Sequence, residues 1–291
     1  MNLWQHYICP ATLHDALLAL RDAPTPATPV GGGTDLLLDL RQGRHIPANT
    51  LVDLTSVREM NTLETRGPCL FIGAAVPLSH ISRHALVAQH AEALREACEL
   101  IGGPQVRNVA TLGGNVAHAL PAADGTIALL ALDATAEIAS LDGSRRLPVA
   151  DLFKGPGAST LISGSELIVG FEIPRKQASD ASAFRRIMRP QGVALPIINL
   201  GIWVRRAEDT IDSVRIAVGP AGPTPRRAQW AEAALVGQAP TDDACRKAAE
   251  AVLEQVTFRT SPRRAGADYR RQLVGPLLRE ALSSAWSRTW R

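Results

Sequence analysis

Two glycine-rich segments hold the residue types best suited to ligand binding. The first, Pro29 to Leu36, reads PVGGGTDL, and the second, Thr111 to Asn115, reads TLGGN. Glycine allows backbone N–H groups to turn inward, and such groups form a concave nest for oxyanions that no Cβ obstructs. The hydroxyls of Thr34 and Thr111 add further donors. Two such segments could hold the two phosphates of a pyrophosphate from opposite sides.

The two segments do not match the common nucleotide-binding loops. The chain contains no Gly-x-x-x-x-Gly-Lys-Ser/Thr sequence, and neither glycine group has the spacing Gly-x-Gly-x-x-Gly. Taken singly, each glycine group also fits a simple structural turn. One hypothesis left open is therefore a non-catalytic nucleotide-binding or scaffold protein in which these glycines only form turns.

Helix and strand patterns alternate around the two segments. Apolar spacing predicts helices at residues 13–23, 34–40, 91–101 and 125–132. Thr34 is the expected N-cap of the second of these helices. β-rich runs predict strands at residues 50–54, 70–74, 135–140, 146–149 and 166–173.

A polar connector at residues 174–182 separates these elements from a second group. Beyond it, three strand patterns precede three helical patterns, at residues 183–188, 197–204, 213–218, 226–235, 241–255 and 267–286. Strands followed by helices favour an α+β second domain. The length of 291 residues also favours two domains, and we place the boundary so that they cover residues 1–176 and 177–291.

Composition and charge exclude several classes of protein. The chain is 46% apolar and 20% charged, as globular domains are. Its 31 basic and 28 acidic residues, a net charge of +3, are too nearly balanced to indicate a nucleic-acid-binding surface. The uncharged stretch at residues 190–204 is too short to span a bilayer. Because no basic leader followed by an apolar run opens the chain, we expect a cytoplasmic protein.

The cysteines give no sign of a metal site. The four residues, Cys9, Cys69, Cys98 and Cys245, lie far apart, without a Cys-x-x-Cys sequence or a Cys/His pair at zinc or iron–sulfur spacing. We therefore expect no metal cluster on this chain.

An ordered set of segments resembles the FAD-binding subunit of the molybdenum hydroxylases, the family of xanthine dehydrogenase and carbon monoxide dehydrogenase. The set comprises GGTDL at 32–36, IGAA at 72–75, RNVATLGGN at 107–115, Pro121, Asp124, LLAL at 129–132, YRRQL at 269–273 and Arg279. The resemblance covers nearly the whole chain. It implies an α+β protein with a p-cresol methylhydroxylase-type FAD-binding domain of two subdomains. A smaller α+β C-terminal domain, a three-stranded antiparallel sheet plus helices, would follow.

The resemblance also implies which residues bind FAD. Residues 29–36 would form the first pyrophosphate and ribitol loop, and residues 111–115 the second. Asp124 matches an acidic residue near the ribitol and flavin, although from the sequence alone it equally fits the N-cap of the helix after Gly125. Ile101 and Ile168 match apolar positions that line the cofactor, and Arg185 falls where relatives often have Lys near the ring. The full expected set is Pro29, Val30, Gly31, Gly32, Gly33, Thr34, Asp35, Leu36, Ile101, Thr111, Leu112, Gly113, Gly114, Asn115, Asp124, Ile168 and Arg185.

Two departures from the family pattern stand out. Some relatives carry an extra iron–sulfur cluster on a Cys-rich insertion before Asp124, whereas only residues 116–123, without cysteine, lie there in this chain. Pro262 stands close to where relatives often have Asp.

The function implied is that of an electron-transfer subunit of a molybdenum-containing hydroxylase. A large partner would carry the molybdenum cofactor and a small partner the two-iron two-sulfur clusters, in a dimer of heterotrimers. FAD on this chain would pass electrons to NAD, a quinone or oxygen, and no side chain of this chain would act as acid, base or nucleophile. The alternative left open is a self-sufficient FAD-dependent oxidoreductase of the same fold.

Overall fold

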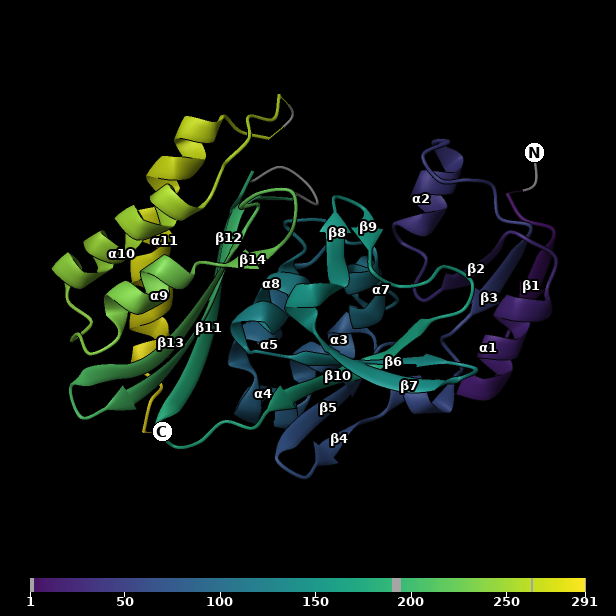
Figure 1. The fold of residues 1–291 in the computed structure, drawn as a ribbon, viewed down its shortest axis with the longest axis horizontal. Coiled ribbons are helices and arrows are strands. Elements are labelled where there is room, and N and C mark those ends of the chain that lie inside the picture. The colour runs from purple at the N-terminus through teal and green to yellow at the C-terminus, as the bar shows by residue number, and fades with distance from the viewer. Residues whose placement is uncertain (1–2, 190–194, 263, 291) are drawn as a thin grey trace.

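The structure is a computed structural model that describes residues 3–189, 195–262 and 264–290. Figure 1 shows two units side by side, one formed by the N-terminal part of the chain in purple to teal and one by the C-terminal part in green to yellow. The expected domain boundary after residue 176 lies in the connector between strands β10 and β11.

The first glycine segment leaves the edge of a small parallel sheet of order β1-β3-β2. Its elements are β1 (His6–Ile8), α1 (Leu13–Asp22), β2 (Ala27–Val30), α2 (Leu36–Arg41) and β3 (Thr50–Asp53). The prediction that Thr34 caps the following helix was wrong, because α2 begins only at Leu36 with Asp35 at the N-cap position. Gly33, at φ 67°, turns the chain just before Thr34 and so delays the helix.

The second glycine segment belongs to a larger subdomain with an antiparallel sheet of order β4-β5-β10-β6-β7. Its strands are β4 (Leu63–Arg66), β5 (Cys69–Gly73), β6 (Thr135–Ser140), β7 (Gly143–Pro148) and β10 (Leu167–Pro174). Its helices are α3 (Leu78–Arg83), α4 (Ala85–His90), α5 (Glu92–Leu100), α6 (Pro104–Arg107), α7 (Leu112–Ala117) and α8 (Asp124–Ala131). Smaller elements are the 3-10 turns η1 (Arg58–Asn61) and η2 (Val149–Leu152) and the strand pair β8 (Phe153–Gly155) and β9 (Ala158–Ser159).

The C-terminal unit is an antiparallel sheet covered by helices on one face. Its elements are β11 (Asp180–Met188), β12 (Pro196–Ala207), β13 (Thr210–Gly219), β14 (Arg226–Arg227), α9 (Gln229–Leu235), α10 (Asp242–Gln255) and α11 (Ala267–Trp286). The three predicted strands are present, and β14 adds a short fourth one beside β13. The helix predicted from residue 226 therefore starts later, because Arg226 and Arg227 pair with β13 instead.

Helix α8 lies between the two units and is buried along its whole length. A helix that is apolar all round, as the sequence GTIALLA requires, is stable only when it is covered on every side. The C-terminal sheet supplies one cover, because α8 packs against β12 and β13. Phe184, Trp203 and Ala217 of that sheet accordingly join the core of the N-terminal unit. None of the helices in the described ranges has the length and apolar character that crossing a bilayer requires.

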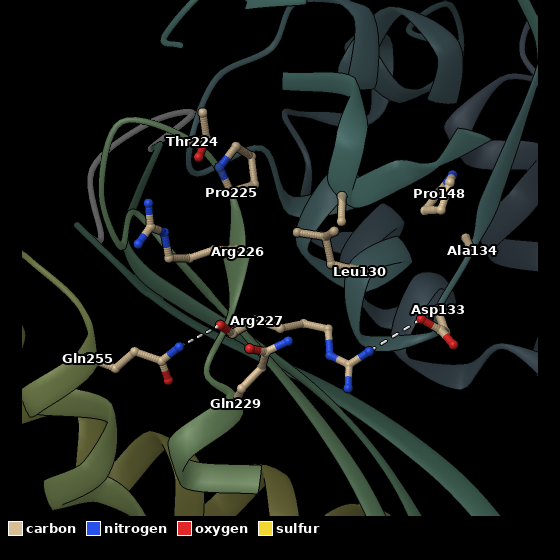
Figure 2. A pocket seen from close by; sticks show the side chains of 11 residues that line it. Leu130, Asp133, Ala134, Pro148, Thr224, Pro225, Arg226, Arg227, Gln229 and Gln255 are labelled. Atoms are coloured by element: carbon tan, nitrogen blue, oxygen red, sulfur yellow. Dashed lines mark hydrogen bonds and ion pairs between the residues drawn. The ribbon is translucent and has the colours of Figure 1, made fainter. Parts of the chain in front are cut away.

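A cavity of about 390 Å³ opens between the end of α8 and the start of α9 (Figure 2). Arg227 reaches across it and lies 3.3 Å from Asp133. The same guanidinium donates to Glu232 at 2.7 Å, so its charge is already compensated. The ion pair between Arg227 and Asp133 thus links the two units across this cavity.

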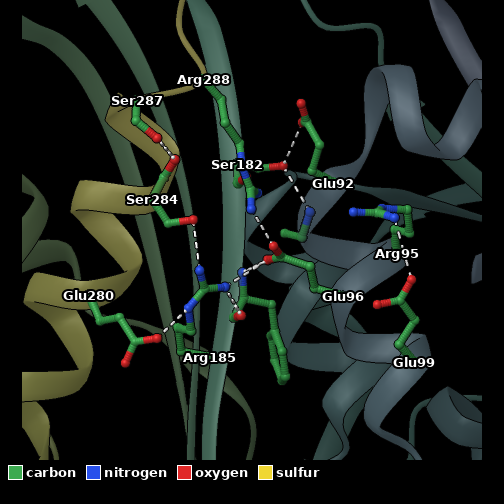
Figure 3. Close-up of polar contacts among 12 residues, drawn as sticks. Glu92, Arg95, Glu96, Glu99, Ser182, Arg185, Glu280, Ser284, Ser287 and Arg288 are labelled. Atoms are coloured by element: carbon green, nitrogen blue, oxygen red, sulfur yellow. Dashed lines mark hydrogen bonds and ion pairs between the residues drawn. The ribbon is translucent and has the colours of Figure 1, made fainter.

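Two carboxylates on α5 bind the C-terminal unit (Figure 3). Glu96 accepts hydrogen bonds from the Phe184 N–H at 2.7 Å, from Arg185 at 3.1 Å and from Arg288. Glu92 accepts from the Ser182 hydroxyl of β11 at 3.4 Å and from Lys176 of the connector at 2.8 Å. Because both carboxylates lie largely out of solvent, these contacts are stronger than surface ion pairs.

The Glu96 contacts can be tested by the variant Glu96→Ala. It leaves three donors without their acceptor, so we expect the free energy of unfolding to fall by about 2–4 kcal/mol in urea denaturation. The control is Glu99→Ala on the same helix, which removes only the exposed pair with Arg95 and should cost less than about 0.5 kcal/mol. Equal effects of the two variants would contradict the assignment.

Candidate functional site

The structure brings the two glycine segments into direct contact. A Cβ at Gly32 would lie 1.9 Å from the carbonyl oxygen of Val109, and a Cβ at Gly31 would lie 2.7 Å from Thr111 Oγ1. Since the atom facing Gly32 belongs to the backbone, no other residue type fits there. The helices that follow the segments also approach, with His118 Nε2 3.9 Å from an Asp39 carboxylate oxygen.

The first segment offers a row of backbone donors. Across the described part of the chain, none of the N–H groups from Gly31 to Leu36 donates to a backbone carbonyl. Gly31 to Thr34 are only partly buried. Consecutive free N–H groups around a residue of positive φ, here Gly33, form an anion-binding concavity. The segment therefore has the donors that a pyrophosphate requires.

In the second segment, the N–H groups of Gly113 and Gly114 already donate to other groups of the chain. Thr111 caps α7, because its Oγ1 accepts from the Gly114 N–H at 3.1 Å. The Gly113 N–H donates to the Ala74 carbonyl at 2.8 Å, and a Cβ at Gly113 would lie 2.6 Å from Ala74 Cβ. Gly114 is exposed, and a Cβ there would meet only Thr111 Oγ1, at 3.1 Å. Gly114 is thus the residue of this segment that borders open space.

Asp124 forms a buried polar cluster at the start of α8. Its carboxylate accepts from Arg186 Nη1 at 2.5 Å and from Asn199 Nδ2 at 2.6 Å. Burial raises the pKa of Asp124, while Arg186 and Asn199 act to lower it. The alternative that Asp124 is an N-cap was wrong, since Ala123 occupies that position and the Asp124 carboxylate turns toward the C-terminal unit.

Asn115 connects this cluster to the second glycine segment. A Cβ at Gly125 would lie 2.7 Å from Asn115 Oδ1, so the amide rests directly on the first turn of α8. In the described ranges, this buried oxygen has no hydrogen-bond partner. Asn115, Asp124 and the two glycine segments therefore form one continuous region.

Two apolar residues of the expected set belong to the N-terminal core, and Arg185 lies at the unit interface. Ile168 is 5% exposed within the N-terminal core, and Ile101 ends α5 where the Arg107 guanidinium donates to its carbonyl at 3.2 Å. Arg185 is bound by Glu96, Glu280 and Ser284 at the unit interface (Figure 3). Among the described residues, the Arg185 side chain forms no hydrogen bond or ion pair with the glycine segments.

Arg186 is the residue that the sequence reasoning missed. The signal was present, because side chains alternate between the faces of a strand and Arg186 shares its face with the core residue Phe184. Arg185, one residue earlier, points to the opposite face and α11. Two adjacent arginines on a strand therefore face opposite sides of the sheet, here α11 for Arg185 and α8 for Arg186.

Comparison with protein families identifies both units of the chain. The profile of the FAD binding domain in molybdopterin dehydrogenase matches residues 3–176. The chain belongs to the FAD-binding subunits of the molybdopterin dehydrogenase family. The profile of the CO dehydrogenase flavoprotein C-terminal domain matches residues 182–285.

Individual members of this family are similar over nearly their whole length. The putative xanthine dehydrogenase FAD-binding subunit of Escherichia coli K12 is 32% identical over 283 residues, covering 94% of each chain. The carbon monoxide dehydrogenase medium chain of Hydrogenophaga pseudoflava is 27% identical over 282 residues, covering 97% of each. A solved structure of carbon monoxide dehydrogenase from that organism superposes with a TM-score of 0.92 at 28% identity, covering 98% of each chain. These matches confirm the predicted fold class, an FAD-binding domain followed by an α+β C-terminal domain.

The residues present fit the cofactor of this family. Free N–H groups at residues 31–36 suit a pyrophosphate, and the unpartnered Asn115 oxygen suits a hydroxyl-bearing chain. Neither of two cavities in the structure, of about 390 and 320 Å³, is lined by the glycine segments. We favour the glycine segments over the larger cavity as the FAD site, because Arg227 in that cavity is already paired with Glu232 and Asp133.

The Asp124–Arg186 pair yields a stability prediction. Asp124→Ala leaves the Arg186 guanidinium, 5% exposed, without its counter-charge. We expect the free energy of unfolding, measured by urea denaturation, to fall by about 3–5 kcal/mol. The double variant Asp124→Leu with Arg186→Met removes both charges and should recover most of that loss. A double variant as unstable as the single one would show that packing, not charge, sets the cost.

Proposed function

We propose that this chain is the electron-transfer subunit of a molybdenum-containing hydroxylase, passing electrons from iron–sulfur clusters on a partner subunit to an external acceptor. The observation that carries the proposal is the pair of glycine segments in contact, one of which offers a row of free backbone donors at residues 31–36. Such a site suits a dinucleotide cofactor bound by its pyrophosphate.

Each part of the site has a proposed role toward FAD. Bound FAD would supply the redox chemistry, including the exchange of single electrons and electron pairs. The N–H groups of residues 31–36 and the open side of Gly114 bind the pyrophosphate. Asp124, held by Arg186 and Asn199, accepts hydrogen bonds from the ribityl chain through its remaining lone pairs. Ile101 and Ile168 support the site from the core, and Arg185 serves the unit interface instead.

The relatives support partner subunits of defined kinds. The matching proteins of Hydrogenophaga pseudoflava and Paenarthrobacter nicotinovorans are named a carbon monoxide dehydrogenase medium chain and a nicotine 6-hydroxylase medium subunit. We propose that this chain likewise works between a large subunit with the molybdenum cofactor and a small subunit with two-iron two-sulfur clusters. A dimer of heterotrimers in the cytoplasm, with NAD, a quinone or oxygen as acceptor, completes the proposal.

The variant Gly114→Val tests the cofactor site. A valine there meets only the Thr111 hydroxyl, so the fold should persist while the branched side chain enters the phosphate space. We expect FAD affinity, measured by titration of flavin fluorescence, to fall at least tenfold with an unchanged circular dichroism spectrum. Gly266→Val is the control, because it adds the same side chain in the C-terminal unit, where a Cβ would have no heavy atom within 4 Å. Unchanged affinity of Gly114→Val would remove the second segment from the site.

Purification from the native source tests the role of the chain. An affinity tag on this chain should recover a large and a small subunit in equal amounts, together with molybdenum, iron and FAD. The isolated chain should bind FAD and turn over no substrate of the complex. If the chain instead runs alone and oxidises a substrate at its flavin, the self-sufficient oxidoreductase replaces the present proposal. If it takes up no FAD at all, the flavoprotein role itself fails.

A further inference from the structure

Arg270, near the start of α11, is a buried cation that forms no ion pair with an acidic residue in the described ranges. It is 1% exposed and is the largest of the fully buried side chains. In the part of the chain that the structure describes, its Nε and Nη1 atoms have no hydrogen-bond partner. An arginine cannot escape this situation by losing its proton, because guanidinium stays charged at any pH a folded protein tolerates. A buried charge of this kind normally has an anion beside it.

Other arginines lie near Arg270 and add to the positive charge of this region. Burial lowers the pKa of the Arg270 guanidinium, and the nearby charges of Arg264 and Arg259 lower it further. Arg189, at the end of β11, donates to the Arg264 carbonyl at 3.0 Å. These four residues, Arg189 just after β11, Arg259 and Arg264 of the α10–α11 connection and Arg270 of α11, are called the arginine cluster below. Figure 1 shows that this connection and the end of β11 lie at the same end of the C-terminal unit.

Exposed apolar side chains border the arginine cluster. Tyr269 precedes Arg270 and is exposed, as are Met188, which precedes Arg189, and Leu195. Met188 pairs with Pro196, so Leu195 lies beside it at the same end of the sheet. Aromatic residues, Met and Arg are the types enriched in protein interfaces. An inorganic anion would contact only the arginines and leave the apolar side chains exposed. A polypeptide would contact the arginines and also cover the apolar side chains, so it fits this surface better.

We propose that the arginine cluster, with Met188, Leu195 and Tyr269, is the docking surface for an acidic segment of a partner polypeptide. The exposed guanidinium groups of Arg189 and Arg259 contact the carboxylates of that segment. Arg270, just beneath, interacts with the same carboxylates through the low-dielectric interior, where charges act over longer distances than in water. The proposal extends the proposed function by giving the chemistry of one subunit contact, and it rests on that function only for the existence of partner subunits.

The isolated chain provides the first test, with Arg270→Met. Removing an uncompensated buried charge should raise the midpoint of thermal unfolding by about 2–4 °C. The control is Arg271→Met, the exposed neighbour on the same helix, which should leave the midpoint unchanged. A lower midpoint for Arg270→Met would mean that the chain itself compensates the charge, and the proposal would be overturned.

The native complex provides the second test. Replacing Tyr269 by the photocrosslinker benzoylphenylalanine should join this chain to a partner peptide that contains Asp or Glu. The same replacement at Trp230, an exposed aromatic of the same unit outside the cluster, should give no such product. Arg270→Met should weaken the complex at least tenfold while the chain keeps its FAD absorbance, and Arg271→Met should not. No crosslink at Tyr269, or one to a peptide without acidic residues, overturns the proposal.

Inorganic phosphate distinguishes a free anion from a polypeptide. If phosphate, compared with chloride at equal ionic strength, stabilises the wild-type chain but not Arg270→Met, and Tyr269 gives no crosslink, the cluster binds a small anion and the docking proposal is wrong. The outcome is independent of the cofactor site, because crosslinking reports the partner whether or not FAD binds. A chain that crosslinks as expected but takes up no FAD would overturn the proposed function and leave the docking surface in place.

Discussion

The close approach of two backbone segments is the constraint on which the site depends. At Gly32 the first segment touches the backbone just before the second, with the Val109 carbonyl where a Cβ would stand. This contact fixes the distance between the end of β2 and the start of α7, which belong to different subdomains. It also accounts for the glycines better than chain flexibility does, since Gly31, Gly32 and Gly113 lack positive φ and are needed for space.

The C-terminal unit also contributes to the candidate site, because it holds Asp124. Asp124 opens a helix of the N-terminal unit, yet both of its strong contacts come from strands of the C-terminal unit. The buried helix α8 needs the same sheet to cover its apolar surface. The same contact between the units thus covers the apolar core and orients the Asp124 carboxylate beside the proposed cofactor site.

Much of this organisation could be predicted from the sequence, because local patterns carried it. The glycine segments, the three long C-terminal strands and the buried apolar helix all follow from spacing and residue type. Two features that the sequence did not reveal depend on tertiary contacts. Arg186 pairs with Asp124, and Asp35 rather than Thr34 occupies the N-cap position of α2. Strand β14 is only two residues long, too short to show any alternation. The uncompensated charge of Arg270 is likewise a property of burial, which no sequence motif encodes.

The contact between Glu96 and Arg288 has a consequence for the order of folding. These residues are 192 positions apart, and Arg288 also donates to the Ser182 carbonyl at 2.8 Å. Because ribosomes make a chain from its N-terminus and domains tend to fold as they emerge, Glu96 lacks one of its three donors until the residues that follow α11 have been made. The contact that joins the last residues of the chain to α5 is therefore the final one to form during synthesis, and a nascent chain stalled before Arg288 would hold Glu96 by its β11 donors alone.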